Sequence, residues 1–302
     1  MTTMTNSHQL FNTVPFLMGH HPVDSIVFVA LIDGQPSFAM RMDYPVEHIE
    51  EKVTLLIEHL KRESANEVVI SFYQPKNVDQ SDNLALLTQK MLSETGIAIS
   101  EFVIVSKGRW RSVLCTNHDC CPPEGTALIS MPKKELLARI SRIEEIDYST
   151  ADFQKLQQSG ALAINDLLVE FREKGSNASL DLLALVLARL SDLQVRDYAL
   201  GVANDELQRE MLPLWLWVCS VAPRGYLAPP ATLLAELAYE NGDGALAMRA
   251  LDKALGDDPE YQLAKLLRRT FAAGWSPQNF KDMRAELHPK ICESLFGAQS
   301  KE

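Results

Sequence analysis

The spacing of apolar residues divides the chain into two parts. Up to residue 132, short apolar runs typical of β-strands alternate with stretches in which apolar residues recur every three or four positions. From residue 133 onward, helical spacing replaces the strand-like runs. The sequence therefore predicts an α/β domain at residues 1–132 and an all-helical domain at residues 133–302.

The first strands form a predicted hairpin. Ile26–Ile32 is apolar on both faces, which indicates a strand covered on both sides. Asp33-Gly34 suits a tight turn and joins this run to Ser37–Met42. Further strands are predicted at Val68–Tyr73, Ile97–Val105 and Arg109–Cys115, with helices at residues 46–62 and Asp82–Leu92. The last strand follows a Ser-Lys-Gly turn at residues 106–108 and should pair antiparallel with Phe102–Val105. The resulting order, β-β-α-β-α-β-β, predicts a mixed sheet and the α/β fold class.

The helical domain contains one recognisable unit. Leu233–Pro259 resembles a single tetratricopeptide hairpin, with a turn at Gly242-Asp243 and with Pro259 opening the next helix. Because solenoids need three or more such units, an ordinary helical hairpin that closes a bundle is the alternative to a partner-binding groove. Other helices are predicted at Lys134–Ile146, Leu162–Arg172, Leu180–Leu190, Glu206–Val221 (with Trp215 and Trp217 in the core), Tyr261–Ala273 and from Ser276-Pro277 to about Leu287.

Composition narrows the class of partner. The 302 residues are 46% hydrophobic and 23% charged, as in an ordinary globular protein, and the formal net charge is −11. This negative charge disfavours nucleic acid and anionic membranes as partners. The first ten residues are polar, and no apolar run approaches the length of a membrane span. Five cysteines suit reduced thiols or a metal better than a disulfide framework, so we expect a cytoplasmic protein.

The predicted sheet brings polar residues to one edge. The carboxyl ends of the three parallel strands would place Asp43, Gln74, Lys76, Asn77 and Lys107 there. The loop before the first strand, with His21, Asp24 and Ser25, reaches the same edge, as does Arg109.

That edge has a chemical and a structural interpretation. In the first, His21 is a general base oriented by Asp24, while Lys107 or Arg109 holds an anionic substrate. In the second, Asp24 and Ser25 are turn residues that bond their own backbone, and Arg109 belongs to a solvated edge face.

A cluster of cysteines follows the last predicted strand. Cys115, His118, Cys120 and Cys121 lie within seven residues and offer the ligands of a tetrahedral zinc ion. Four ligands from one short loop would strain the backbone, so a packed loop of reduced cysteines is the alternative. A structural zinc ion is therefore the one cofactor that the sequence suggests.

Three motifs carry a family resemblance. They are VPFLMGHHPVDSIV from Val14, RWRSVLCx4CCPPEGT from Arg109, and the run AYxxGD…ALxxALxxDP from Ala238. In combination they are similar to an uncharacterised actinobacterial family that is known only as a domain of unknown function. The resemblance spans nearly the whole chain and implies no activity, cofactor or catalytic residue. That family commonly has an aromatic residue in place of His20, which weakens any mechanism that needs both histidines.

The lack of catalytic signatures favours an interaction protein. No P-loop, GxGxxG, GxSxG or HExxH pattern occurs in the sequence, so common nucleotide, hydrolase and metalloprotease mechanisms lose their usual support. We expect an adaptor or regulatory protein whose helical domain binds a protein partner. The alternative is an enzyme or small-anion-binding protein that uses the sheet edge around His21, Asp24 and Arg109. In a third interpretation, a zinc ion only stabilises the first domain.

Overall fold

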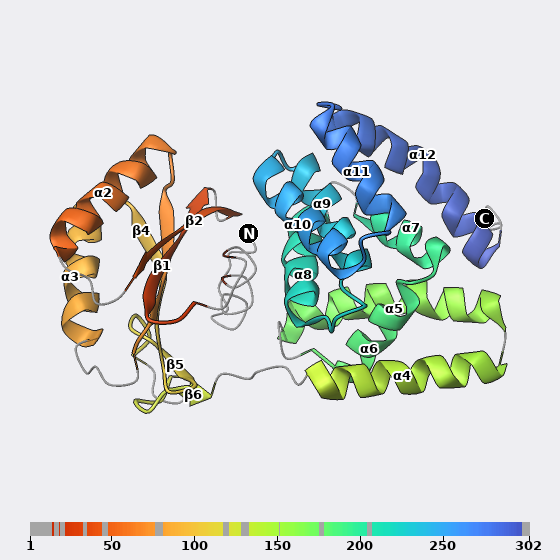
Figure 1. The fold of residues 1–302 in the computed structure, drawn as a ribbon, viewed down its shortest axis with the longest axis horizontal. Helices are drawn as coiled ribbons and strands as arrows, with labels where there is room; N and C mark the ends of the chain where they lie inside the picture. The colour runs from red at the N-terminus through yellow and green to blue at the C-terminus, as the bar shows by residue number, and fades with distance from the viewer. Residues whose placement is uncertain are drawn as a thin grey trace. The chain divides into compact units, whose positions relative to one another are not determined.

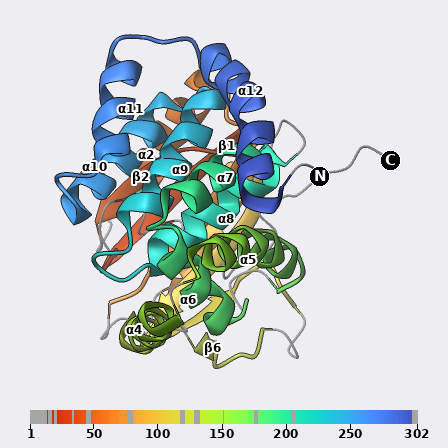
Figure 2. The ribbon, with the colours of Figure 1, turned by 90° about the vertical axis from the view of Figure 1, so that its right-hand side faces the viewer.

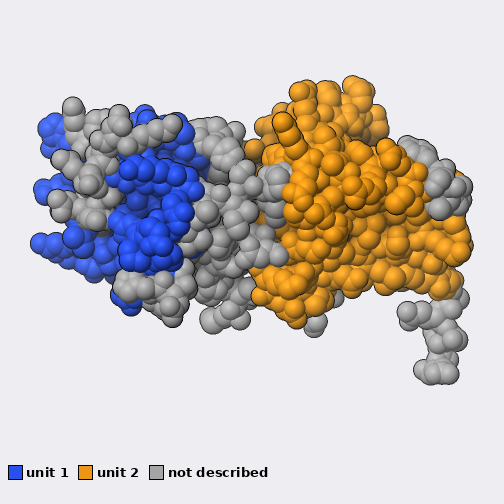
Figure 3. Space-filling view, turned by 90° about the horizontal axis from the view of Figure 1, so that it is seen from below, with its two compact units in different colours: residues 1–130 blue, residues 131–302 orange. Residues whose placement is uncertain are grey.

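The computed structural model describes residues 22–32, 35–43, 48–75, 81–116, 121–127, 133–150, 152–174, 178–203 and 207–297, together with Val14 and Met18. The chain divides into two compact units, Met1–Ser130 and Met131–Glu302 (Figure 3). Each unit is described by itself below.

A mixed sheet forms the body of unit 1 (Figure 1). Its described strands follow the order β2-β1-β3-β4-β5-β6. The central pair β3 and β4 is parallel, and the other neighbouring pairs are antiparallel. The strands are β1 Ser25–Ile32, β2 Gln35–Asp43, β3 Glu67–Tyr73, β4 Ala98–Ser106, β5 Arg109–Ser112 and β6 Thr126–Ala127. The predicted α/β class and the order of the first seven described elements are confirmed. The strand β6 was not predicted, because two residues carry no pattern.

Two helices cover one face of this sheet. Figure 1 shows α2 (Ile49–Arg62) and α3 (Ser81–Ser93) on the same side, and the buried core there joins Phe28 and Ile70 of the sheet to Leu60 of α2. Val27 and Val29 alternate with these residues and point to the other face, where they are also buried. The double burial of the first strand is therefore confirmed.

The strand β5 is flanked by two well-defined turns. Lys107 and Gly108 both have positive φ, as the two central residues of a type I′ hairpin require, and they pair β4 with β5 as predicted. The prediction that the strand runs to Cys115 is wrong. The hydroxyl oxygen of Ser112 accepts from the backbone N–H groups of Leu114 and Cys115, at 3.2 and 3.1 Å, and this turns the chain out of the sheet.

Unit 2 is a helical bundle built around α8 and α9 (Figure 2). Trp215 and Trp217 of α8 are 0% and 1% exposed, which confirms them as core residues, and Trp217 stacks on Phe171 of α5. The short helix α7 was not predicted. The helices are α4 Lys133–Thr150, α5 Phe153–Lys174, α6 Leu180–Arg189, α7 Leu193–Val202, α8 Gln208–Val221, α9 Ala228–Glu240, α10 Gly244–Asp257, α11 Gln262–Ala272 and α12 Pro277–Phe296.

The predicted helical hairpin is formed by α9 and α10, which pack side by side (Figures 1 and 2). Gly242 has a φ of 84°, and the side chain of Asp243 caps α10 by accepting from the N–H of Leu246 at 2.8 Å. The prediction that Pro259 opens the next helix is wrong. Asp258 accepts from Tyr261 N–H in a turn, so α11 begins only at Gln262.

The last helix extends beyond its predicted end. Ser276 caps α12, as predicted, by accepting from the N–H of Gln278 at 3.2 Å. The helix then continues past Leu287 and through Pro289 to Phe296. This extra length makes α12 long enough to lie across several other helices of the bundle.

The close packing of α5 gives a test of the bundle. A Cβ atom on Gly160 would lie 2.8 Å from the Cβ of Arg189 and 2.9 Å from both methyl carbons of Val195. We expect Gly160→Ala to lower the free energy of unfolding by about 1–3 kcal/mol, because overpacking outweighs the better helix propensity of alanine. Gly256 in α10 has open space around it, so Gly256→Ala is the matched control and should be neutral or stabilising by up to about 1 kcal/mol. Urea denaturation of both variants measures the difference; equal stabilities would contradict this packing.

Candidate functional site

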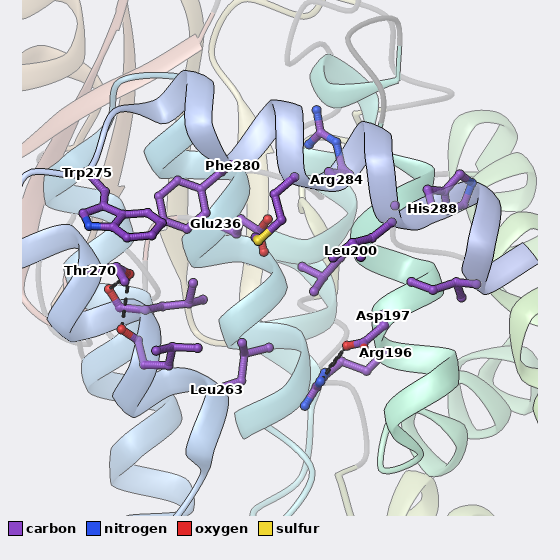
Figure 4. A pocket seen from close by; sticks show the side chains of 16 residues that line it. Arg196, Asp197, Leu200, Glu236, Leu263, Thr270, Trp275, Phe280, Arg284 and His288 are labelled. Atoms are coloured by element: carbon purple, nitrogen blue, oxygen red, sulfur yellow. Dashed lines mark hydrogen bonds and ion pairs between the residues drawn. The ribbon is translucent and has the colours of Figure 1, made fainter.

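A pocket of about 340 Å³ lies among α7, α9, α11 and α12 in unit 2 (Figure 4). This volume is at the lower end of the range of ligand-binding clefts. In Figure 4 the helix α12 runs along one side of the pocket and α11 along another, with the turn at Trp275 between them. The pocket is therefore built where two consecutive helices line opposite walls.

Both helices present an apolar stripe to this space. On α11 the stripe is Leu263, Leu266, Leu267 and Thr270, and on α12 it is Phe280, Met283, Leu287 and Ile291. Spacings of three and four residues place each set on one face of its helix. In the core of a bundle, such stripes would be covered by another helix.

The rim of the pocket is exposed. Leu266, Trp275, Met283 and Leu287 retain 49, 50, 44 and 43% of their accessible surface, and all four line the pocket. We call the pocket together with these four rim residues the α11/α12 groove. A contiguous apolar surface of this kind marks an interaction site more often than scattered exposed leucines do.

The floor of the groove contains a carboxyl group without a partner. Glu236 of α9 is only 5% exposed and lines the pocket. Its carboxylate forms no hydrogen bond or ion pair with any residue that the structure describes. Burial raises its pKa from the ordinary 4.5 to about 8, and the nearby charge of Glu240 adds to the shift. At neutral pH the Glu236 side chain is therefore mainly protonated and uncharged.

One turn further along α9, Glu240 has the opposite environment. Its Oε2 accepts from Nη1 of Arg284 at 2.6 Å, and both side chains are buried. Gln208 donates a second hydrogen bond to the same oxygen. Glu240 is therefore neutralised within the protein, whereas Glu236 is not.

At one end of the groove, His288 lies beside Cys292, with Nε2 and Sγ 3.5 Å apart. A Cβ atom on Gly201 of α7 would come within 2.0 Å of the His288 ring, so glycine is required where α7 and α12 cross. Burial lowers the pKa of His288 and raises the pKa of Cys292. These directions favour a neutral imidazole beside a thiol rather than the ion pair of an activated nucleophile.

The sheet edge of unit 1 assembles as its predicted topology requires. Ser25 lies opposite both Asp43 and Tyr73, Tyr73 lies opposite Val105, and Ser106 lies opposite Arg109. Asp24, Ser25, Asp43, Gln74, Lys107 and Arg109 therefore occupy one edge of the sheet. His20, His21, Lys76 and Asn77 lie outside the described residues, so the distance from His21 to Arg109 is not defined.

Several of these edge residues already have structural contacts. The Arg109 guanidinium donates to the backbone carbonyls of Glu124 and Gly125, and Asp43 forms an ion pair with Arg41 at 2.6 Å. Asp24 has a φ of 44°, as in a turn. The proposed catalytic and anion-binding roles at this edge stay predictions.

The cysteine cluster is described only in part. Cys115 and Cys121 are half-buried, while His118 and Cys120 lie outside the described residues. Within the described residues, no group of three potential ligands is placed to hold a metal ion. The zinc site therefore stays a prediction. Mass spectrometric metal analysis of the full chain tests it: stoichiometric zinc, together with a lower melting temperature after chelation, would support the site, and metal-free protein would exclude it.

A comparison with protein-family models assigns most of the chain to one family. The family model described as "Domain of unknown function (DUF4192)" matches residues 8–138 and 132–278, which together cover most of the sequence. The chain belongs to the DUF4192 family. No curated protein and no solved structure matches it. Among the described helices of this DUF4192 protein, none is both long and apolar enough to cross a bilayer.

In this DUF4192 protein the most distinctive site residue was missed from the sequence. Glu236 and Glu240 interrupt the apolar run LLAELAYE, and a helix that is buried almost all round leaves such acids no route to water. That pattern is the signal that could have found them. The pairing of Glu240 with Arg284, 44 residues away, has no counterpart in local sequence.

Glu236 predicts an unusual dependence of stability on pH. The folded protein holds a proton that the unfolded chain releases, so stability should fall as the pH rises from about 4.5 to about 8. Glu236→Gln removes this loss of stability. We expect the free energy of unfolding of this variant to exceed that of the wild type by on the order of 2–4 kcal/mol at pH 9, with little difference at pH 5. Urea denaturation of both proteins at both pH values measures this difference in the free energy of unfolding. Glu293→Gln, exposed on α12, is the control, and a Glu236→Gln variant that follows the wild type at both pH values would contradict the assignment.

Proposed function

We propose that this DUF4192 protein is an interaction protein and that its helical unit binds an amphipathic helix of a protein partner in the α11/α12 groove. The observation that carries the proposal is the pair of facing apolar stripes with an exposed apolar rim. The tetratricopeptide-like hairpin α9–α10 supplies the rigid support behind them.

The dimensions favour a helical segment. The α12 stripe runs over the twelve residues from Phe280 to Ile291, about 16 Å at a rise of 1.5 Å per residue. A bound helix of about three turns would therefore match it, with apolar anchors at positions i, i+3 or i+4, and i+7. The exposed rim provides contacts along the length of such a helix, beyond the pocket itself.

The chemistry of the groove also favours binding over catalysis. The polar groups that line it are an uncharged carboxyl, ion pairs internal to the protein, and the His288 imidazole, which is neutral beside the thiol of Cys292. Thr270 donates its hydroxyl hydrogen to carbonyls of its own helix. None of these groups is an activated nucleophile, and only the protonated carboxyl of Glu236 could donate a proton to a substrate.

A second function, small-anion binding at the sheet edge of unit 1, has one specific observation in its favour. The hydroxyl groups of Ser25, Ser71 and Tyr73 are buried and have no hydrogen-bond partner among the described residues, and the strand register puts all three on the same face. Burial raises the pKa of Tyr73, so its hydroxyl stays a donor. A small anion would accept hydrogen bonds from such donors, whereas the strand register places Arg109 on the opposite face of the sheet.

Peptide selection with mutated grooves tests the proposed function. A library of helix-forming peptides of about 14 residues, four turns, is selected against the full chain. We expect Leu266→Asp and Met283→Asp to weaken the selected peptides at least about 30-fold, because a charge in the apolar contact costs about 2 kcal/mol or more.

The control is Leu162→Asp on α5, a leucine that is 54% exposed and does not line the groove. This variant should bind the selected peptides as the wild type does. Peptides that bind all three variants equally would refute the groove as the binding site, and urea denaturation confirms that each variant is folded.

A further inference from the structure

We propose that the bound helix inserts a lysine side chain into the floor of the α11/α12 groove, where its ammonium group pairs with Glu236. This inference rests on the proposed function and adds the chemical identity of the central anchor.

The first argument is the balance of charges around the floor. Arg284 of α12 pairs with Glu240, and Arg196 of α7 donates to Asp197 with its Nε at 2.9 Å. Each cation that lines the pocket is thus engaged by an acid of its own, and Glu236 is the acid left over.

The second argument is the free-energy cost of burying the Glu236 carboxyl without a hydrogen-bond partner. A buried polar group without a hydrogen bond destabilises a protein, so each such group in a native structure calls for an explanation, and a ligand that satisfies it is one. Glu236 lines the pocket rather than a closed core, so a donor that enters the groove can reach its carboxylate. An apolar occupant alone would leave the group buried and without a partner.

The surrounding walls select lysine. Leu200, Leu267, Phe280 and Met283 line the same pocket as Glu236 and can pack against the four methylene groups of a lysine stem. Arginine would bring five N–H donors to a floor that offers one carboxylate, leaving several of them unpaired. A lysine ammonium has three donors on a single atom, so fewer remain unsatisfied.

Pairing with lysine couples helix binding to the release of a proton from Glu236. The ammonium group favours the ionised carboxylate, so at pH 6–8 Glu236 gives up its proton when the helix binds. Affinity should then rise by up to about tenfold per pH unit in this range. The other titratable or charged groups near the floor are Glu240 on the same helix, Arg284 and His288 on α12, and Arg196 and Asp197 on α7; among the described residues, the α11 wall contributes none.

The experiment analyses the peptides selected against the full chain, synthesised with lysine or methionine at the candidate position. We expect lysine to be enriched at one position between apolar anchors, and its replacement by methionine to weaken binding to the wild type about 10- to 100-fold. Against Glu236→Gln the same replacement should change affinity less than about threefold, and the rise of affinity with pH should disappear. Calorimetry in two buffers of different ionisation enthalpy counts the proton released.

The variants separate the possible failures. Two results would overturn this inference and leave the proposed function intact. In the first, the selected peptides depend on Leu266 but show no enrichment of lysine. In the second, replacing lysine by methionine weakens binding to the wild type and to Glu236→Gln equally. Selected peptides that do not depend on Leu266 would overturn both. Glu236→Gln is nearly isosteric and removes a buried ionisable group, so it should fold; Glu293→Gln controls for the general loss of an acid.

Discussion

The buried ion pair between Glu240 and Arg284 is the interaction on which the groove of unit 2 depends. It joins α9, which is buried almost all round, to the middle part of α12. Removing one partner of such a pair costs about 3–5 kcal/mol, because the other charge is left in the core. Further along α12, Gln158 donates to the carbonyl of Leu295 and His288 packs against Gly201. These contacts attach α12 to α9, α5 and α7, and the space toward α11 remains open.

Two glutamates one turn apart on α9 therefore have different consequences. Glu240 is used inside the protein to position a helix. Glu236 has the same side chain, yet its burial costs stability without an internal compensation. A fold that is otherwise consistent tends to break local rules at functional sites, and this carboxyl is such a departure within the core of unit 2.

The sequence was sufficient for the elements whose patterns are local. The doubly apolar β1, the Lys107-Gly108 hairpin and the α9–α10 turn each carry their signal within a few residues. Local patterns did not reveal where β5 ends, because a hydroxyl of Ser112 competes with the ladder hydrogen bonds. They also did not reveal the groove, since four helices contribute to it. The lack of a partner for Glu236 at its floor depends on which distant side chains pair with the neighbouring charges. The strand topology correctly placed the described residues of the sheet edge, whereas the contacts of their side chains, such as that of Arg109 with Gly125, do not follow from topology.

The position of Trp275 also has a practical consequence for spectroscopy. Of the four tryptophans in the chain, Trp110, Trp215 and Trp217 are at most 5% exposed, whereas Trp275 is 50% exposed at the rim of the groove. Tyr239 donates a hydrogen bond to its carbonyl at 2.6 Å, and Phe280 lies 6.2 Å from its ring, so the indole is held in place while one side faces solvent. The solvent-sensitive part of the intrinsic fluorescence therefore comes from one ring. The protein carries a built-in optical reporter at the entrance to its groove, and occupation of the groove would shift the emission toward the blue without any attached dye.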